Sequence, residues 1–569
     1  MAIAATLAVT NPITATTAHD FVLPGTQPGT LTDTIPNPES CRACHVAPIV
    51  DAWRGSMMGQ AGRDPLFWAA LAVANHDAAS AGEFCLRCHG VRGWLEGRSQ
   101  QADGAGLTEL DIDAGIACEI CHRMVDPVAT QNPDPASTLV DIAIRQALTN
   151  TPPIDHVASG MFIIDPQDRR RGPFDVAGSG VTHGAYQTAF LGQAADPVIE
   201  SRLCGTCHNI DNPTLSWDAG RGQYWPNEPD APSPSVAKGA LYPIESTFDE
   251  WLQSDYPNGV FAPEFAGARP DGRVDSCQSC HMPRETGFAA DTTSLNPTFR
   301  DCQTTGCLPR HTLMGGNTWA PQLLQDERWR LHSSPDAAQL DLAIASARTM
   351  LQKAATLSVT LTIENGAPIA TVRVTNQTGH KLPTGYAEGR RMWLRLRAFD
   401  ATGAMIYESG AYNDAAGELL ADSALKVYEV QQGMTPELAA ELGSEPGPSF
   451  HFVLNNTVVK DNRIPPRGYT MAAYDVAGLR PVGAAYVDGQ HWDDTVYALP
   501  ESAVSVEAAL FYQTASKEYI EFLQANGGAD GEALHQLWQS SKSPPELMAT
   551  ARAAPGESTF YLPLIRSEP

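Results

Sequence analysis

The chain has 569 residues, of which 43% are hydrophobic and 18% are charged, a composition that excludes a disordered or low-complexity protein. Its formal net charge of −27 argues against nucleic acid as a partner, because binding nucleic acid requires clustered Lys and Arg. The length allows roughly three or four domains. The predicted elements indicate an α+β protein, with a loop-rich, mainly helical first part, then a β-sandwich and a short helical tail.

The first element, residues 1–20, is apolar and rich in small side chains. It resembles a secretory signal with cleavage after Ala18, although no Lys or Arg precedes Arg42. The alternative is a disordered apolar arm. The chain contains no stretch of roughly 18 to 20 apolar residues, so we expect no membrane span.

Residues 21–333 contain five copies of the pattern Cys-x-x-Cys-His, whereas the composition alone predicts about 0.007 copies. In this pattern two thiols on one helical turn can add to the vinyl groups of a haem, and the following histidine can ligate its iron. The segment is therefore predicted to be a pentahaem cytochrome c domain with five covalently attached haem c groups. The cysteines that attach haem would be Cys41, Cys44, Cys85, Cys88, Cys118, Cys121, Cys204, Cys207, Cys277 and Cys280, and the axial histidines would be His45, His89, His122, His208 and His281. The competing reading is a set of tetrahedral zinc sites, which does not explain why a histidine follows each pair.

Two cysteines, Cys302 and Cys307, lie outside the motifs. Because haem is attached to apocytochrome outside the cytoplasm, where disulfides persist, we expect these two to be bonded and the protein to be periplasmic or extracellular.

Each haem iron has a sixth position, and seven residues outside the motifs are candidates for it. His311 precedes two glycines that allow close approach to a haem edge. His183 lies about twenty residues before the fourth motif. His380 sits in a loop rich in Gly and Pro between two predicted strands, where its alternative role is to hold that loop by hydrogen bonds. The weaker candidates are Met58, His76, His156 and His332.

The rest of the chain changes from one periodicity to another. Residues 334–356 are predicted to form a linker helix, which starts at Ser334-Pro335. Residues 357–513 show the two-residue alternation of strands, with a hairpin turn at Asn365-Gly366, and are predicted to form the β-sandwich. Residues 514–569 are predicted to be a helical tail. The segment 211–248, rich in Pro, Asn, Asp and Gly, is expected to be a long surface loop.

Several stretches resemble bacterial multihaem c-type cytochromes related to the cytochrome c554 type, and together they span most of the chain. They are residues 53–61, 64–67, 170–174, 247–252, 277–283 (Cys-Gln-Ser-Cys-His-Met-Pro), the His311 motif and 379–385 (Gly-His-Lys-Leu-Pro-Thr-Gly). The resemblance implies electron transfer in the periplasm or outside the cell, bis-histidine haems in close pairs, and a C-terminal β-domain. In that family a Ser-x-His element follows a Trp, whereas here Ser56-Met57-Met58 places a methionine there.

Three functions are compatible with the sequence. The favoured one is an electron carrier that exchanges electrons with redox partner proteins. The second is a multihaem oxidoreductase acting on a small nitrogen or sulfur species at an open haem, although enzymes of the ammonia-forming nitrite reductase kind usually carry lysine in one motif, and all five motifs here end in histidine. The third is a subunit that self-associates into an extracellular cytochrome filament.

Overall fold

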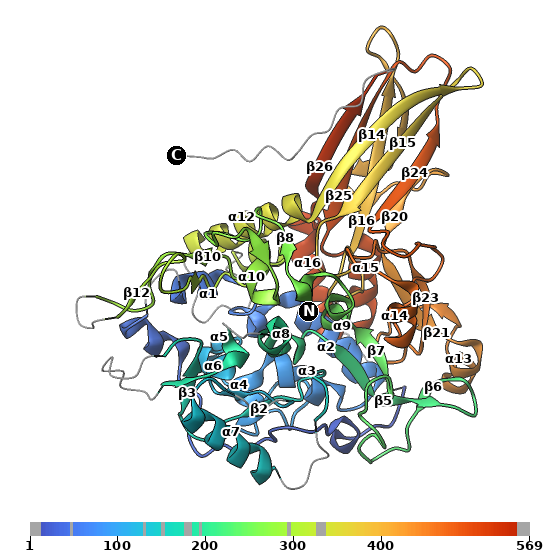
Figure 1. Cartoon of the computed structure of the whole chain (residues 1–569). Helices are drawn as coiled ribbons and strands as arrows, with labels where there is room; N and C mark the ends of the chain where they lie inside the picture. The colour runs from blue at the N-terminus through green and yellow to red at the C-terminus, as the bar shows by residue number, and fades with distance from the viewer. Residues whose placement is uncertain are drawn as a thin grey trace, which may run out of the picture.

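The computed structural model describes residues 13–45, 49–128, 132–148, 154–175, 185–192, 196–292, 297–325 and 337–554. Helices and small sheets are mixed throughout, as expected for the α+β class. A rounded body of helices and short strands carries an elongated arm of long strands (Figure 1). None of the helices in the described part is long and apolar enough to cross a membrane.

The N-terminal half is built from short helices. Three of them, α2, α7 and α8, begin with Asp-Pro, in which the Asp side chain accepts from the backbone of the first turn and Pro occupies the first helical position. The helices of this half are α1 Val50–Gly55, α2 Pro65–Asp77, α3 Ala81–His89, α4 Val91–Leu95, α5 Glu109–Ala114, α6 Cys118–His122, α7 Pro135–Ala147, α8 Pro197–Gly205, α9 Thr247–Leu252, α10 Cys277–His281 and α11 Trp319–Leu324, with 3-10 helices η1 Ala18–Phe21, η2 Pro38–Ala43, η3 Ala61–Arg63, η4 Ala189–Leu191 and η5 Tyr256–Asn258.

Short strands pair between these helices. The expectation of a long loop over 211–248 is wrong, because β5, β6 and β7 form a three-stranded sheet there in the order β6-β5-β7. The strands of this half are β1 Met124–Val125, β2 Ile163–Ile164, β3 Arg170–Gly172, β4 Ala185–Gln187, β5 Ile210–Asp218, β6 Gln223–Pro226, β7 Leu241–Glu245, β8 Val260–Phe261, β9 Arg273–Val274, β10 Arg284–Glu285, β11 Gly287–Phe288, β12 Phe299–Arg300 and β13 Leu308–Pro309.

Helix α12 (Ala337–Ala354) leads into the arm, and its predicted start at Ser334-Pro335 lies outside the described residues. The hairpin prediction is confirmed: β14 and β15 are antiparallel, and Asn365 (φ 51°) and Gly366 (φ 85°) both adopt the left-handed conformation that a tight two-residue turn requires. One sheet has the order β14-β15-β24, and the other has the order β17-β16-β25-β26 with β20 also paired to β16. Strand β14 packs against β25 and β26, and one hydrophobic cluster contains buried residues of both sheets.

Two of the predicted boundaries need correction. The range 357–513 is not sandwich throughout, because residues 430–476 include a small sheet in the order β22-β21-β23 and two helices. The predicted helical tail contains the strand β26, which pairs with β25 and in which buried side chains alternate with exposed ones. The elements of this half are β14 Ala355–Glu364, β15 Ala367–Asn376, β16 Arg391–Phe399, β17 Met405–Ser409, β18 Tyr412–Asn413, β19 Glu418–Leu419, β20 Val427–Tyr428, β21 Val430–Met434, α13 Pro436–Leu442, β22 Gly447–Pro448, β23 Thr457–Asp461, α14 Met471–Val476, β24 Trp492–Ala498, β25 Ser505–Gln513, α15 Lys517–Asn526, α16 Gly528–Ser541 and β26 Glu546–Ala553.

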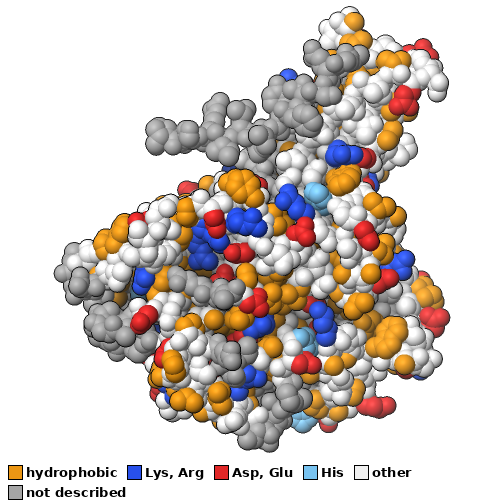
Figure 2. All heavy atoms as spheres, viewed as in Figure 1, with side chains coloured by type: hydrophobic (Ala, Val, Ile, Leu, Met, Phe, Trp, Pro, Cys, Tyr) orange, Lys and Arg blue, Asp and Glu red, His pale blue; other side chains and the backbone are white. Residues whose placement is uncertain are grey.

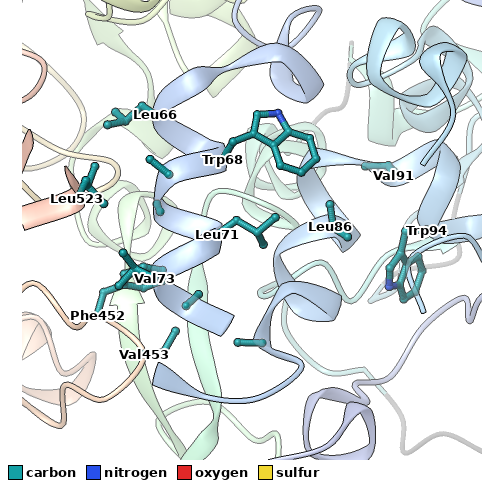
Figure 3. Close-up of a cluster of buried hydrophobic side chains, with 14 of the residues drawn as sticks. Leu66, Trp68, Leu71, Val73, Leu86, Val91, Trp94, Phe452, Val453 and Leu523 are labelled. Carbon is teal, nitrogen blue, oxygen red and sulfur yellow. The ribbon is translucent and has the colours of Figure 1, made fainter. Parts of the chain in front are cut away.

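The largest hydrophobic core joins the two halves around helix α2. Trp68 and Leu71 of α2 face Leu86 of α3 on one side, while Phe452 and Leu523 from the C-terminal half approach from the other (Figure 3). The 3-10 helix η1 packs against α3 and β5, and the residues just before it reach the end of α2, where the backbone of Thr14 donates to that of Asp77 at 2.9 Å. Part of the predicted leader segment therefore contacts the folded body.

Candidate functional site

Each described motif forms a single helical turn. Helices α6 and α10 consist of one motif each, and α3 ends with another. In the first and fourth motifs the histidine N–H donates to the carbonyl of the first cysteine, from His45 to Cys41 at 2.8 Å and from His208 to Cys204 at 2.9 Å. Residues three and four apart in such a turn lie on one face, so the two thiols and the imidazole of each motif point to the same side.

The five motifs converge on one another. Three pairs of thiols from different motifs lie close enough for one thiol to change the pKa of the other: Cys41 with Cys118, Cys88 with Cys207, and Cys204 with Cys277. In the first pair, Cys118 is the main cause that lowers the pKa of Cys41 to about 7. Cys121 also lies near enough to help raise the pKa of Cys204 and of Cys207, although the neighbouring thiol and burial are the larger causes. The first motif therefore adjoins the third, the third adjoins the fourth, and the second and fifth both adjoin the fourth.

In three of the motif histidines, Nδ1 is hydrogen-bonded to a backbone carbonyl oxygen. The acceptors are the Ala289 carbonyl for His45 at 2.7 Å, the Arg171 carbonyl for His122 at 2.7 Å, and the Met314 carbonyl for His281 at 2.5 Å. A carbonyl oxygen can only accept, so Nδ1 carries the proton and Nε2 keeps its lone pair. This is the tautomer with which a histidine binds a metal through Nε2.

His208, in the fourth motif, has a different partner. Its Nδ1 lies 3.7 Å from Oε1 of Glu245, longer than a hydrogen bond but within the range of an ion pair. Burial alone would lower the pKa of His208, but Glu245 outweighs burial and raises it. Burial alone would raise the pKa of Glu245, but His208 lowers it. This histidine therefore faces a carboxylate, whereas the three above face carbonyls.

Two histidines from outside the motifs face motif histidines. The ring centres of His122 and His311 are 6.3 Å apart with an interplanar angle of 18°, and those of His281 and His380 are 6.4 Å apart at 27°. Two imidazoles on opposite sides of one metal would have ring centres about 6.4 Å apart, because each metal–nitrogen bond is about 2 Å long and each nitrogen lies about 1.2 Å from its ring centre. Both separations match that value.

The two outer histidines also have the required tautomer. His311 Nδ1 lies 3.0 Å from the Pro309 carbonyl, and His380 Nδ1 lies 3.0 Å from the Lys381 carbonyl. Burial is the main cause that lowers the pKa of His311 to about 3 and that of His380 to about 4. Both imidazoles are therefore neutral near pH 7, as metal binding through nitrogen requires.

A buried network of charges holds the loop that carries His380. Lys381 Nζ lies 2.6 Å from Asp461, and Arg463 bonds both oxygens of Asp461 at 2.8 and 2.7 Å. Glu250 of helix α9 accepts from the Lys381 backbone at 3.1 Å and lies 3.1 Å from Arg463. Burial alone would raise the pKa of Asp461, but the charges of Arg463 and Lys381 outweigh it and lower the pKa to about 2. The network ties the His380 loop to the N-terminal half.

The other predicted ligands occupy varied positions. His183 and His332 lie outside the described residues. His76 Nδ1 lies 3.4 Å from Asp77, and His156 Nδ1 lies 2.8 Å from Asp155. Met58 is half-buried in the turn after α1, where its backbone carbonyl accepts from Ile116. The ring contacts found among the described residues join two of the predicted sixth ligands, His311 and His380, to motif histidines.

His89 of the second motif stacks against an aromatic ring of helix α2, a contact that was not predicted from the sequence. The rings of Phe67 and His89 are 4.1 Å apart and nearly parallel, at 7°. Phe67 lies in one of the stretches that carry the family resemblance, so the sequence marks it as a residue of interest. The sequence does not mark Glu245 or Asp461, because both act through contacts with residues distant along the chain.

The donor set fits haem better than zinc. Among the described residues, no group of three or more His, Cys, Asp and Glu is arranged to hold a single metal ion, whereas a tetrahedral zinc site needs four ligands. The ten motif cysteines are not in disulfides, while Cys302 and Cys307 are bonded to each other as predicted. On the face shown in Figure 2, acidic and basic side chains are interspersed.

Comparison with known proteins adds one structural similarity. No family model and no curated protein matches the chain. Among solved structures, the chain is similar to the crystal structure of a penta-heme cytochrome c552 from Thermochromatium tepidum, with a TM-score of 0.48 and 15% sequence identity. The match covers 91% of this chain and 98% of that chain.

Proposed function

We propose that this protein is a pentahaem c-type cytochrome that carries electrons through five closely packed haems. The observation that carries the proposal is the pair of histidine separations, 6.3 and 6.4 Å, each between a motif histidine and a distant histidine. A covalently held haem supplies an iron that accepts and releases one electron. The residues of the chain attach it, ligate it and set its potential.

Two axial pairs follow from the geometry. His122 and His311 would ligate the haem of the third motif, and His281 and His380 would ligate the haem of the fifth motif. For the other three haems, the candidates for the sixth iron ligand are those predicted from the sequence: Met58, His76, His156, His183 and His332.

The thiol contacts support a branched order of the haems. The third motif adjoins both the first and the fourth, and the second and fifth both adjoin the fourth. An electron entering at the first motif would reach the fourth through the third, and could leave through the second or the fifth. Exchange with separate redox partner proteins would take place at these outer motifs.

Export from the cytoplasm is part of the proposal. Attachment of haem to Cys-x-x-Cys-His motifs takes place outside the cytoplasm, and the Cys302–Cys307 disulfide fits an oxidising compartment. We therefore propose a periplasmic or extracellular location.

The direct test is the intact mass of the purified protein, which should show five covalently attached haems per chain. A double substitution of Cys118 and Cys121 by alanine should remove one haem and leave four. Four or six haems in the unaltered protein would contradict the proposal.

Spin state separates the carrier from the oxidoreductase, and particle size separates it from the filament. Five low-spin haems in the electron paramagnetic resonance of the oxidised protein would exclude an open haem and hence the oxidoreductase. A high-spin haem that binds nitrite, hydroxylamine or sulfite would indicate the oxidoreductase instead. A length distribution of particles in electron micrographs, rather than a single small species, would indicate the filament.

A further inference from the structure

The fourth motif differs from its neighbours in the partner of its histidine. The carboxylate of Glu245, at the end of strand β7, faces His208 Nδ1 at 3.7 Å, whereas His45, His122 and His281 each face a backbone carbonyl. At 3.7 Å the contact is longer than a hydrogen bond, so Glu245 acts on the motif through its charge. A negative charge close to the motif histidine stabilises the oxidised iron over the reduced one.

Glu245 is held in place by the C-terminal half. Its Oε1 lies 3.1 Å from the hydroxyl of Thr247, which lies 2.9 Å from the hydroxyl of Thr384. The Thr384 hydroxyl donates to Glu250 at 2.7 Å. The Thr247 hydroxyl therefore donates either to Glu245 or to the oxygen of Thr384. The backbone N–H of Gly385 adds a contact to the Thr247 hydroxyl at 3.2 Å.

The same loop therefore serves two motifs. Residues 378–385 carry His380, which faces the fifth motif, and Thr384, which anchors the group beside the fourth. The fourth motif is also the branch point of the cluster, because the second, third and fifth motifs all adjoin it. A change in potential at this position would affect every path through the protein.

We propose that Glu245 is a positioning residue that lowers the redox potential of the haem at the fourth motif, and that the 378–385 loop keeps it in place. The inference rests on the proposed haem function. With this lower potential, the haem of the fourth motif would be the last of the five to be reduced. Electrons held by the protein would then reside mainly on the haems of the outer motifs and would occupy the fourth only transiently.

The test is a spectroscopic redox titration of the haem-loaded Glu245→Gln variant. Glutamine keeps the size of the side chain and removes the charge. One of the five components should shift to higher potential by at least a tenfold change in its reduction equilibrium, which is about 59 mV for one electron. The other four components should shift much less.

Glu429→Gln is the matched control. Glu429 is a partly buried carboxylate like Glu245, but it lies in the C-terminal half and its partner is Lys460 at 2.9 Å rather than a motif histidine. This variant should leave all five components in place. Thr384→Val, which removes the anchor and keeps the carboxylate, should shift the same component as Glu245→Gln by a smaller amount.

Five haems by intact mass, with no component shifted in Glu245→Gln, would overturn the inference and leave the proposed function standing. A chain without five haems would instead overturn the proposed function. If neither variant folds, the unaltered protein decides: one component well below the other four supports the inference, and five overlapping components overturn it.

Discussion

Replacing His380 by alanine is the sharpest test of the link between the two halves of the chain. The ring of His380 faces that of His281 at 6.4 Å, the separation of two imidazoles on one iron. Alanine removes the distal nitrogen and leaves His281 and its attachment cysteines intact. The haem of the fifth motif should then change from low-spin to high-spin, because it has lost one strong axial ligand.

The size of the effect follows from the number of motifs. With five motifs in the chain, one haem in five should change, so about one-fifth of the low-spin signal should be lost. Added imidazole should restore the signal, because the truncated side chain leaves a space that the free ring can fill. His311→Ala should affect a different fifth, and the double variant about two-fifths, because the two histidine pairs share no residue.

The assay is electron paramagnetic resonance of the oxidised protein, with circular dichroism to show that the fold is retained. His491→Ala is the matched control, since His491 also belongs to the C-terminal half but is only partly buried and faces none of the described motif histidines, with its Nδ1 3.1 Å from the Gly489 carbonyl. A folded His380→Ala variant with an unchanged spectrum would refute the axial assignment. His380 would then have only the role of holding its own loop.

Three further predictions concern stability and redox state. Asp461→Asn should destabilise the protein by about 3–5 kcal/mol in thermal or denaturant unfolding, because it removes the carboxylate partner of buried Lys381 and leaves Arg463 with Glu250 as its acidic partner. Since the folded pKa of Asp461 is about 2 and the unfolded value is about 3.9, this stability is present above about pH 4 and is lost as the pH falls towards 2; a pH-independent difference between variant and parent would count against it. Glu388→Gln should stabilise the protein at pH 8 and have little effect at pH 4. Burial raises the pKa of Glu388 to about 8, so above the unfolded pKa of about 4.3 the folded state holds a proton that the unfolded state has lost, and folding becomes less favourable. Equal melting temperatures of variant and parent at pH 8 would contradict this. Alkylation of the unreduced native protein should detect no free thiol at Cys302 or Cys307, and labelling of either would be decisive against the disulfide.

The parts of the site that depend on local chemistry could be predicted from the sequence. The motifs form helical turns because the attachment chemistry and the turn use the same spacing of residues. The hairpin at Asn365-Gly366 was predictable because both residues tolerate the left-handed conformation. His311 and His380 were chosen for the Gly and Pro around them, and the structure brings both against motif histidines.

The parts that depend on distant contacts could not be predicted. Strand β5 contains Pro213, which argues against a strand, yet the register shifts between Asn212 and Ser216, so the proline lies where the ladder is interrupted. Strand β26 is rich in alanine, a weak strand former, and is held by its pairing to β25. In both cases the strand that pairs with the segment cannot be identified from the residues of the segment itself.

The two halves that periodicity separates are physically one unit. The core around helix α2 needs Phe452, Val453 and Leu523 from the C-terminal half to cover the side opposite α3 (Figure 3). The imidazole facing His281 comes from position 380, almost a hundred residues further along the chain, and Glu250 in turn binds the loop that presents it. Neither contact can form before both halves are present and packed together. The C-terminal half therefore does more than decorate a cytochrome: it completes the hydrophobic core beside the second motif and the coordination proposed for the fifth, and it anchors the carboxylate beside the fourth.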